Sequence, residues 1–307
     1  RIKFFVDDDP MLQKRVIGSS IIESKDYLIK HNKSVDQVLI AIANIETKRL
    51  KNIILSLQEI NLPILKIPSI DEIKSGSSEI SRLKPISIDD LLGREKVIPD
   101  QNLLSKNIKN KNICVIGAGG SIGAEICNQV LNLQPSKLIL FERNEVSLYT
   151  IEKEIRNKEY NFKQSIKIIP ILGCATNQTI LKKIFKVHNI DIVFHTAAYK
   201  HVPLVEINPI EGLSNNIIST KTLCEACISE NIERMVFIST DKAVRPTNVM
   251  GASKRVAELI VNEYSNKNRT IFSTVRFGNV LGSSGSVVPL FNSQIDKGGP
   301  LTITHPE

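Results

Sequence analysis

Apolar and polar positions alternate in two separate series along the chain, and each series predicts strands separated by helices. In the first series, strands are predicted at residues 2–6, 35–43 and 63–67, and helices at 24–31 and 47–60. Parallel strands need a long crossover between them, which is usually a helix. This series therefore predicts a small α/β domain with a parallel sheet over residues 1–73.

The second series is stronger and begins at residue 112. Its strands are predicted at 112–116, 137–141, 167–172, 190–195, 234–239 and 270–276, and its helices at 121–133, 146–158, 178–188, 209–230 and 250–266. Crossovers through these helices predict a Rossmann-type doubly wound parallel sheet. We expect residues 112–307 to form this α/β domain, and residues 74–111, which are rich in Ser, Gly, Pro and charge, to be a linker.

The composition is typical of a soluble globular protein, with 42% hydrophobic and 23% charged residues. The 40 Lys and Arg residues are interspersed with 32 Asp and Glu and form no aromatic-studded basic stripe, so we expect no nucleic-acid partner. The net charge of +8 leaves open a phosphate-rich ligand or an anionic membrane surface as alternatives to a solvated surface. No apolar run reaches the roughly 20 residues that a membrane-spanning helix needs.

The five cysteines favour a reducing, cytoplasmic setting. Cys114 and Cys127 fall in a predicted buried strand and helix, where cysteine packs as a small apolar residue. Cys224 and Cys227 have the spacing of half a zinc or redox site, but they lie inside a predicted helix without a second Cys or His pair nearby. We therefore expect no metal site.

A glycine-rich turn of sequence Gly-Ala-Gly-Gly-Ser-Ile-Gly follows the first strand of the second series and opens its first helix. In this position backbone N–H groups and the helix dipole can bind a pyrophosphate. Gly117 is expected to permit the tight turn, Gly120 to let the phosphate approach, and Gly123 to let the helix pack on the strand. Ser121 and Ile122 are expected to contact the same cofactor. No Lys-Ser/Thr pair follows, so the turn predicts a dinucleotide site and not a Walker-type loop.

Residues at the ends of the next strands are expected to contact the adenosine half of the cofactor. Glu142 follows the second strand, where a carboxylate can accept hydrogen bonds from ribose hydroxyls, and therefore favours NAD. The adjacent Arg143 could instead hold a 2′-phosphate, so NADP stays open. Cys174, after the third strand, is expected beside the adenine, with a plain loop as the alternative. Ala197 and Ala198, after the fourth strand, complete the cofactor-binding set.

A second polar group, Thr240-Asp241-Lys242, stands at the end of the fifth predicted strand. Met250 and Lys254 follow at the start of the next helix. Strand ends at this edge of a doubly wound sheet point into the ligand crevice. The group therefore predicts reacting side chains, with a surface ion pair between Asp241 and Lys242 as the alternative.

Four runs of residues together resemble the extended short-chain dehydrogenase/reductases. They are the glycine turn, the run His195-Thr-Ala-Ala-Tyr-Lys-His-Val-Pro-Leu-Val-Glu206, the run Ser239-Thr-Asp-Lys-Ala-Val-Arg-Pro-Thr-Asn-Val-Met-Gly-Ala-Ser-Lys254 and the run Arg276-Phe-Gly-Asn-Val-Leu-Gly282. More narrowly, the whole chain resembles the capsular-polysaccharide-type UDP-N-acetylglucosamine 4,6-dehydratases. Larger members carry transmembrane helices before a small α/β domain. The resemblance therefore implies a soluble piece of a homo-oligomeric protein anchored at the cytoplasmic face of the inner membrane.

The resemblance implies that NAD takes hydride from sugar C4, that water leaves across C5 and C6, and that the hydride returns to C6. Most of the superfamily has a general-base Tyr where this chain has Met250, and the large dehydratases share the Met. We therefore expect Lys242 to be the base at C5, and Asp241, kept protonated, to be the acid for the departing 6-hydroxyl. Lys254 is expected to hold the nicotinamide ribose and keep the local field positive, and Thr240 to hydrogen-bond the 4-hydroxyl.

The UDP-sugar substrate is expected to meet Lys200, after the fourth strand, and Asn279, Ser283 and Ser284, near its diphosphate. An ordinary flexible loop is the alternative for the last three. The substrate part of the domain is expected to continue beyond Glu307. Two rival functions stay open: a UDP-sugar 4-epimerase and a non-catalytic dinucleotide-sensing protein.

Overall fold

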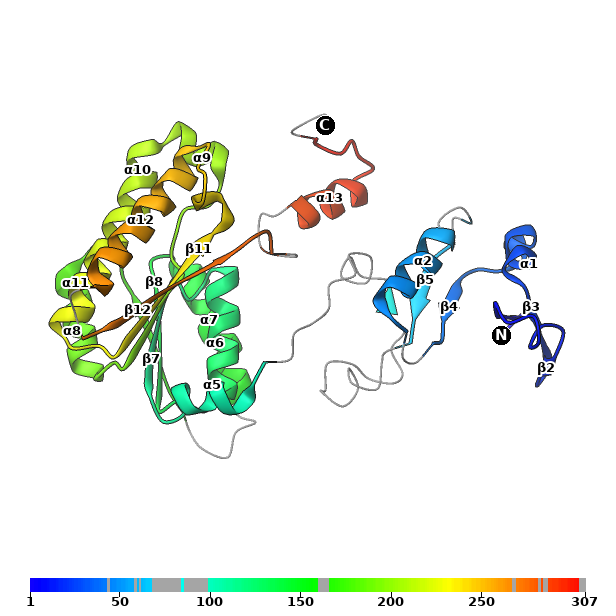
Figure 1. Cartoon of the computed structure of the whole chain (residues 1–307), viewed down its shortest axis with the longest axis horizontal. Coiled ribbons are helices and arrows are strands. Elements are labelled where there is room, and N and C mark those ends of the chain that lie inside the picture. Colours follow the sequence, from blue (N-terminus) through cyan, green and yellow to red (C-terminus); the bar gives the residue numbers. More distant parts are fainter. Residues whose placement is uncertain are drawn as a thin grey trace. The chain divides into compact units, whose positions relative to one another are not determined.

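The computed structural model describes residues 1–42, 45–57, 60, 62–67, 84–85, 99–159, 166–266, 269–280, 283 and 287–303. The chain divides into two compact units, Arg1–Ile98 and Pro99–Glu307. Each unit contains both strands and helices, and the two types alternate most regularly in the second unit (Figure 1). Within the described ranges, no helix has the length and apolar character needed to cross a membrane.

The first unit holds two small mixed sheets, and the prediction of one parallel sheet is wrong. The strands are β1 (Phe5–Val6), β2 (Val16–Ile17) and β3 (Ser20–Glu23) in the order β1-β3-β2, and β4 (Val38–Ile40), β5 (Ile64–Lys66) and β6 (Lys84–Pro85) in the order β4-β5-β6. Pairs β1/β3 and β4/β5 are parallel, whereas β2 and β6 run antiparallel to their neighbours. A two-residue turn with Gly18 at a φ of 60° folds β3 back on β2, and this hairpin accounts for part of the difference.

Helices α1 (Lys25–Lys30) and α2 (Thr47–Leu57) contribute the apolar side chains that close the core of this unit. Leu28 of α1 and Leu57 of α2 are buried in one cluster. Phe4, next to β1, and Ile64 of β5 pack against the same cluster. Residues beside both small sheets therefore share one core.

The second unit is the doubly wound parallel sheet that the sequence predicts. Its strands are β7 (Asn112–Ile116), β8 (Lys137–Glu142), β9 (Lys167–Leu172), β10 (Ile192–His195), β11 (Arg234–Thr240) and β12 (Ile271–Phe277). They are all parallel and lie in the order β12-β11-β10-β7-β8-β9. The order reverses between β7 and β10, and ligands of such sheets bind at the carboxyl ends of the strands at this point.

Helices cover both faces of this sheet (Figure 1). The helices of this unit are α5 (Gln101–Ile108), α6 (Ser121–Asn132), α7 (Glu145–Glu159), α8 (Gln178–His188), α9 (Val202–Ile207), α10 (Pro209–Leu213), α11 (Ser219–Ser229), α12 (Val249–Ser265) and α13 (Val287–Asp296), and Figure 1 draws α13 apart from the sheet. Alternate residues of β7 enter different cores: Ile113 and Val115 pack on one face, and Cys114 and Ile116 on the other. Burial on both faces explains why the central strands β7 and β8 are nearly continuous apolar runs in the sequence.

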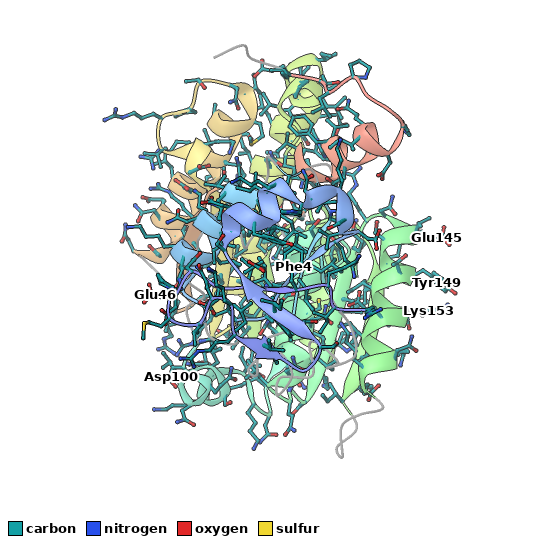
Figure 2. All side chains as sticks on the ribbon, turned by 90° about the vertical axis from the view of Figure 1, so that its right-hand side faces the viewer. Phe4, Glu46, Asp100, Glu145, Tyr149 and Lys153 are labelled. Carbon is teal, nitrogen blue, oxygen red and sulfur yellow. The ribbon has the colours of Figure 1, made fainter. Side chains whose placement is uncertain are left out.

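Several elements of the second unit differ from the sequence-based expectation, among them the helices α9 and α13, which it did not include. Helix α5 lies inside residues 74–111, and its Ile108 is buried in the core beneath α6 and α7. Asp100, labelled in Figure 2, caps α5 by accepting hydrogen bonds from the N–H groups of Asn102 and Leu103. The single helix expected at 209–230 is divided by a π-helical segment, Ser214–Ile218. Such segments are frequent at functional sites.

Candidate functional site

The glycine turn is built so tightly that side chains cannot enter it. Gly117 has a φ of 83°, and a Cβ atom there would lie 2.7 Å from the backbone nitrogen of Ala197. A Cβ atom on Gly123 would lie 2.0 Å from the carbonyl oxygen of Gly117. Both glycines are thus required by the backbone: Gly117 lets β7 approach the end of β10, and Gly123 lets α6 start directly on the turn.

The other two glycines of the turn have different surroundings. A Cβ atom on Gly119 would lie 2.5 Å from the Cβ of Ser147 in α7, so this position also excludes a side chain. The sequence predicted no role for Gly119, since the neighbour that requires it is 28 positions away in a different helix. Gly120, the N-cap of α6, would meet only the Gly117 carbonyl at 3.4 Å and otherwise faces open space. This opening is the approach that a phosphate needs.

A pocket of about 460 Å³, here called the adenosine-side pocket, lies beside this turn. Most of the residues predicted to bind the cofactor line it: Gly117, Gly120, Glu142, Arg143, Cys174, Ala197 and Ala198. Gly123 is buried behind the turn, and Ser121 is the first residue of α6. The tertiary structure therefore brings together side chains from the ends of β7, β8, β9 and β10 at the switch point of the sheet.

Glu142, at the end of β8, is hydrogen-bonded to the glycine turn that follows β7. Its Oε2 accepts a hydrogen bond from the Gly119 N–H at 3.1 Å, and its Oε1 accepts from the N–H groups of Arg143 and Asn144 at 2.9 and 3.0 Å. Cys174 is half-buried, which opposes ionisation, but hydrogen bonding to Thr176 lowers the pKa of the Cys174 thiol below its usual value. Both side chains lie where an adenosine would be held.

A second pocket of about 350 Å³, here called the catalytic pocket, adjoins the first. The two share Thr196, Ala198 and Tyr199, in the loop after β10. The predicted residues that line it are Ile122, Lys200, Thr240, Lys242, Met250, Lys254, Asn279 and Ser283. Ile122 therefore lies in this pocket and not beside the adenosine-side residues. Ser284 lies outside the described residues, and Asp241 is adjacent to the lining without belonging to it.

Lys254 is buried beneath the catalytic pocket. It is 5% exposed, its Nζ donates to the carbonyl oxygen of Ile238 at 2.7 Å, and it lies 4.0 Å from the centroid of the Phe237 ring. Burial lowers the pKa of Lys254 to about 7, although Glu258 opposes the shift. Burial therefore favours the neutral amine of Lys254, which opposes the expectation that this side chain keeps the local field positive.

Asp241 and Lys242 form an ion pair at the edge of the same pocket. Lys242 Nζ lies 3.2 Å from Asp241 Oδ1 and 3.1 Å from Asn279 Oδ1, and Thr240 donates to Asp241 Oδ1 at 3.0 Å. The hydrogen bonds from Lys242 and Thr240 lower the pKa of Asp241. The expectation that Asp241 is kept protonated is wrong for this state, because its neighbours are donors that stabilise the carboxylate.

A buried carboxylate that the sequence did not predict supports this pocket from below. Glu258 of α12 accepts hydrogen bonds from Ser239 at 2.7 Å and from the Nε and Nη2 atoms of Arg276 at 2.7 and 2.6 Å. Burial opposes its ionisation, but the bonds from Arg276, Ser239 and Arg255 lower the pKa of Glu258 to about 2. The position four residues after Lys254 is the signal that could have located it on the same helix face.

Asn216, in the π-helical segment, was also missed. It is 1% exposed, and its side chain accepts from the Tyr199 N–H at 2.8 Å and donates to the Tyr199 carbonyl at 3.1 Å. Its Nδ2 also donates to Ser253 Oγ at 2.9 Å, which in turn donates to the carbonyl of Met250. One amide thus holds the loop between the two pockets against the helix that carries Met250.

His195, at the end of β10, is fully buried and serves the structure in its neutral form. The Thr220 hydroxyl donates to the Asn216 carbonyl at 2.7 Å, so it accepts from His195 Nε2 at 3.0 Å. Burial and the charge of Lys254 lower the pKa of His195 well below its usual value. In the part of the chain that the structure describes, no group of three or more His, Cys, Asp or Glu side chains could hold a metal ion.

The chain matches the model of the family described as "Polysaccharide biosynthesis protein" over residues 113–307. It belongs to this family. Across 98% of its length it is 42% identical to the "Capsular polysaccharide biosynthesis protein CapD" of Staphylococcus aureus, of which it covers 51%. The solved structure of Pen from Bacillus thuringiensis matches 65% of the chain at 36% identity with a TM-score of 0.59, and 61% of that structure is covered.

Relatives whose names state a reaction do not point to a single chemistry. A "UDP-N-acetylglucosamine 4,6-dehydratase (inverting)" of Campylobacter jejuni is 32% identical over 63% of the chain and 57% of its own length. A "UDP-glucose 4-epimerase" of Rickettsia canadensis is also 32% identical, over 64% of the chain and 57% of its own length. The chain spans about half the length of its longer relatives such as CapD. The names of these relatives therefore do not distinguish dehydration from epimerisation.

Proposed function

We propose that this polysaccharide biosynthesis protein is a nucleotide-sugar 4,6-dehydratase that uses NAD and converts UDP-N-acetylglucosamine to a UDP-4-keto-6-deoxy sugar. The observation that carries the proposal is the composition of the catalytic pocket. Met250, which cannot transfer a proton, stands on its wall together with Thr240, Lys242 and Lys254. The acid–base groups nearest to Met250 on this wall are then Lys242 and Lys254, with Asp241 paired to Lys242, while Tyr199 and His201 line the pocket from the loop after β10.

The adenosine-side pocket fits a dinucleotide. The glycine turn admits no side chain at Gly117, Gly119 or Gly123, while Gly120 opens to the pocket. The Glu142 carboxylate stands at the end of β8, where it would accept hydrogen bonds from ribose hydroxyls, which favours NAD over NADP. When bound, NAD would supply the hydride acceptor and donor that oxidation at C4 and reduction at C6 require.

Two side chains are proposed to handle the C4 hydroxyl. The Thr240 hydroxyl is oriented by its bond to Asp241, and its remaining lone pair can hold the substrate hydroxyl. Lys254 has a pKa of about 7, so its neutral amine can accept the hydroxyl proton, and the ammonium that this transfer forms can then donate to the nicotinamide ribose. In most of the superfamily, the general base for this hydroxyl is a Tyr at the position that Met250 takes in this chain.

Asp241 and Lys242 are proposed to perform the elimination after a proton transfer between them. In the resting pair Asp241 is the carboxylate and Lys242 the ammonium, 3.2 Å apart. A substrate that covers this exposed pair removes water from it, and removal of water favours the neutral form. Transfer of one proton from Nζ to Oδ1 yields an amine, which can remove the C5 proton, and a carboxylic acid, which can protonate the departing 6-hydroxyl.

One assay tests the proposal against its rivals. The chain is incubated with UDP-N-acetylglucosamine and NAD, and the nucleotide sugar is examined by mass spectrometry and NMR. Loss of one water supports the dehydratase. An unchanged mass with an inverted C4 centre would show an epimerase. Tight dinucleotide binding without any change in the sugar would favour a non-catalytic sensor.

A further inference from the structure

The Arg143 side chain reaches from one wall of the adenosine-side pocket to the other. Its backbone follows β8, next to Glu142. Its Nη1 donates to Oδ1 of Asn215, in the π-helical segment, at 3.0 Å, and its guanidinium carbon lies 5.4 Å from the centroid of the Tyr199 ring. Arg143, Asn215 and Tyr199 all line this pocket, and Arg143 is exposed. The side chain therefore bridges the two walls at the solvent side of the pocket.

The wall that receives Arg143 is anchored in the core. Asn215 Nδ2 donates to Oδ1 of the buried Asn216 at 3.2 Å. Asn216 also holds both backbone polar groups of Tyr199. The acceptor and the aromatic ring that meet the guanidinium are thus positioned by the same buried amide. A contact made to a pre-positioned wall loses less conformational entropy than one made between two mobile side chains.

The contacts of the guanidinium are electrically neutral. They are the amide oxygen of Asn215 and the phenol ring of Tyr199. The neighbouring Glu142 carboxylate instead accepts hydrogen bonds from three backbone N–H groups. Neutral contacts leave the positive charge of Arg143 available to the phosphates or the adenine face of a cofactor beneath it. Single contacts of this kind on an exposed side chain are weak enough to open for exchange.

We propose that Arg143 is a clasp that closes over the adenosine half of the bound dinucleotide and slows its release, and that it does not serve to read a 2′-phosphate. The inference rests on the proposed function, in which the hydride returns within one cycle and the cofactor need not leave between turnovers. Arg143 is then a positioning residue that retains the cofactor, and Asn215 accepts the hydrogen bond that holds the Arg143 side chain in place.

The test measures release of NADH and NADPH from the chain by stopped-flow fluorescence, with excess NAD⁺ as the displacing ligand. We expect Arg143→Ala and Asn215→Ala each to accelerate NADH release about three- to tenfold, the size expected for one weak contact. The double variant should release no faster than Arg143→Ala, because both changes remove the same bridge. NADPH release should change by the same factor as NADH release.

The matched control is Lys153→Ala, which removes a positive charge from α7, where the side chain points to solvent away from both pockets (Figure 2). It should leave both release rates unchanged. If Arg143 binds a 2′-phosphate instead, Arg143→Ala will weaken the binding of NADPH far more than that of NADH. Asn215→Ala will then change the binding of neither dinucleotide. This result would contradict the proposed role of Arg143 in retention. Unchanged release from both single variants overturns it too. A wild-type chain that binds neither dinucleotide overturns the proposed function itself.

Discussion

The Nζ atom of Lys254 donates a hydrogen bond to the carbonyl oxygen of Ile238 at 2.7 Å, in the buried region beneath the catalytic pocket. Burial there lowers the pKa of Lys254 to about 7. Met250 lies one helical turn before it and offers no ionisable group. A lysine that exchanges its proton near neutral pH thus stands close to the position where most of the superfamily has its general base.

The burial of Lys254 predicts a stability that depends on pH. Its folded pKa of about 7 is below the ordinary 10.5, so the unfolded chain binds more protons between these values. The free energy of unfolding therefore rises from pH 7 to 10.5, and the cost of burying the charge is largest below pH 7. Lys254→Met should gain stability relative to wild type at pH 6 and lose this gain towards pH 10. Urea unfolding at several pH values measures it, with Lys153→Met as a control that shows no such trend.

The same pKa predicts the pH dependence of the first hydride transfer. If Lys254 accepts the C4 hydroxyl proton, only its neutral form is competent, so the rate should rise with pH and level off above about 7. The measurement is NADH absorbance in a single turnover with UDP-N-acetylglucosamine. A rate that is flat from pH 6 to 9 would contradict the assignment of Lys254 as the acceptor.

The geometry of the glycine turn predicts that two alanine variants differ in stability although both lose affinity for the dinucleotide. Gly123→Ala places a Cβ atom 2.0 Å from the Gly117 carbonyl, so it should reduce stability by about 2 kcal/mol or more and abolish dinucleotide binding. In Gly120→Ala the added Cβ meets only that carbonyl, at 3.4 Å, so the fold should be retained. Binding of NADH to this variant should still weaken, because the methyl group faces the pocket. Thermal melting and NADH fluorescence separate the two effects.

The ion pair between Glu258 and Arg276 predicts that the free energy of unfolding falls at acidic pH. The folded pKa of Glu258 is about 2, below its ordinary 4.5, so its contribution is present above pH 4.5 and is lost as the pH falls towards 2. Glu258→Gln should reduce the free energy of unfolding at pH 7 by about 2 kcal/mol, because Arg276 is partly exposed and keeps some hydration. Glu152→Gln, which breaks an exposed pair with Arg156 on α7, should cost no more than about 0.5 kcal/mol.

The elimination step predicts the effect of changes in the exposed ion pair. Asp241→Asn and Lys242→Ala should each reduce the rate of product formation by about a hundredfold or more, the usual contribution of a general acid or base. The NADH dissociation constant should stay near that of wild type, since neither side chain lines the adenosine-side pocket. Lys158→Ala, which breaks a comparable exposed pair with Glu154, is the control. Near-normal turnover by either active-site variant would remove that residue from the mechanism.

Strands β7, β8 and β10 could be predicted because they are buried on both faces and are therefore largely apolar. The polar edge of the sheet was predictable from its place at the strand ends: Glu142 and Thr240 are the last residues of β8 and β11, and Lys242 lies two residues beyond β11. The first unit was predicted less well. Its strands have two to four residues, which is too short for a periodic signal, and their pairing depends on the hairpin near Gly18.

The sequence by itself determined the doubly wound sheet, the glycine turn and the residue types at the strand ends, since these follow from local apolar periodicity and from backbone sterics. Only the tertiary structure decided what those side chains do. It directs Arg143 across the pocket to Asn215, brings Lys242 to within 3.1 Å of Asn279, and buries Lys254 until its pKa is about 7. Protonation and direction depend on neighbours distant along the chain, and their fields and hydrogen bonds act only after folding brings them together.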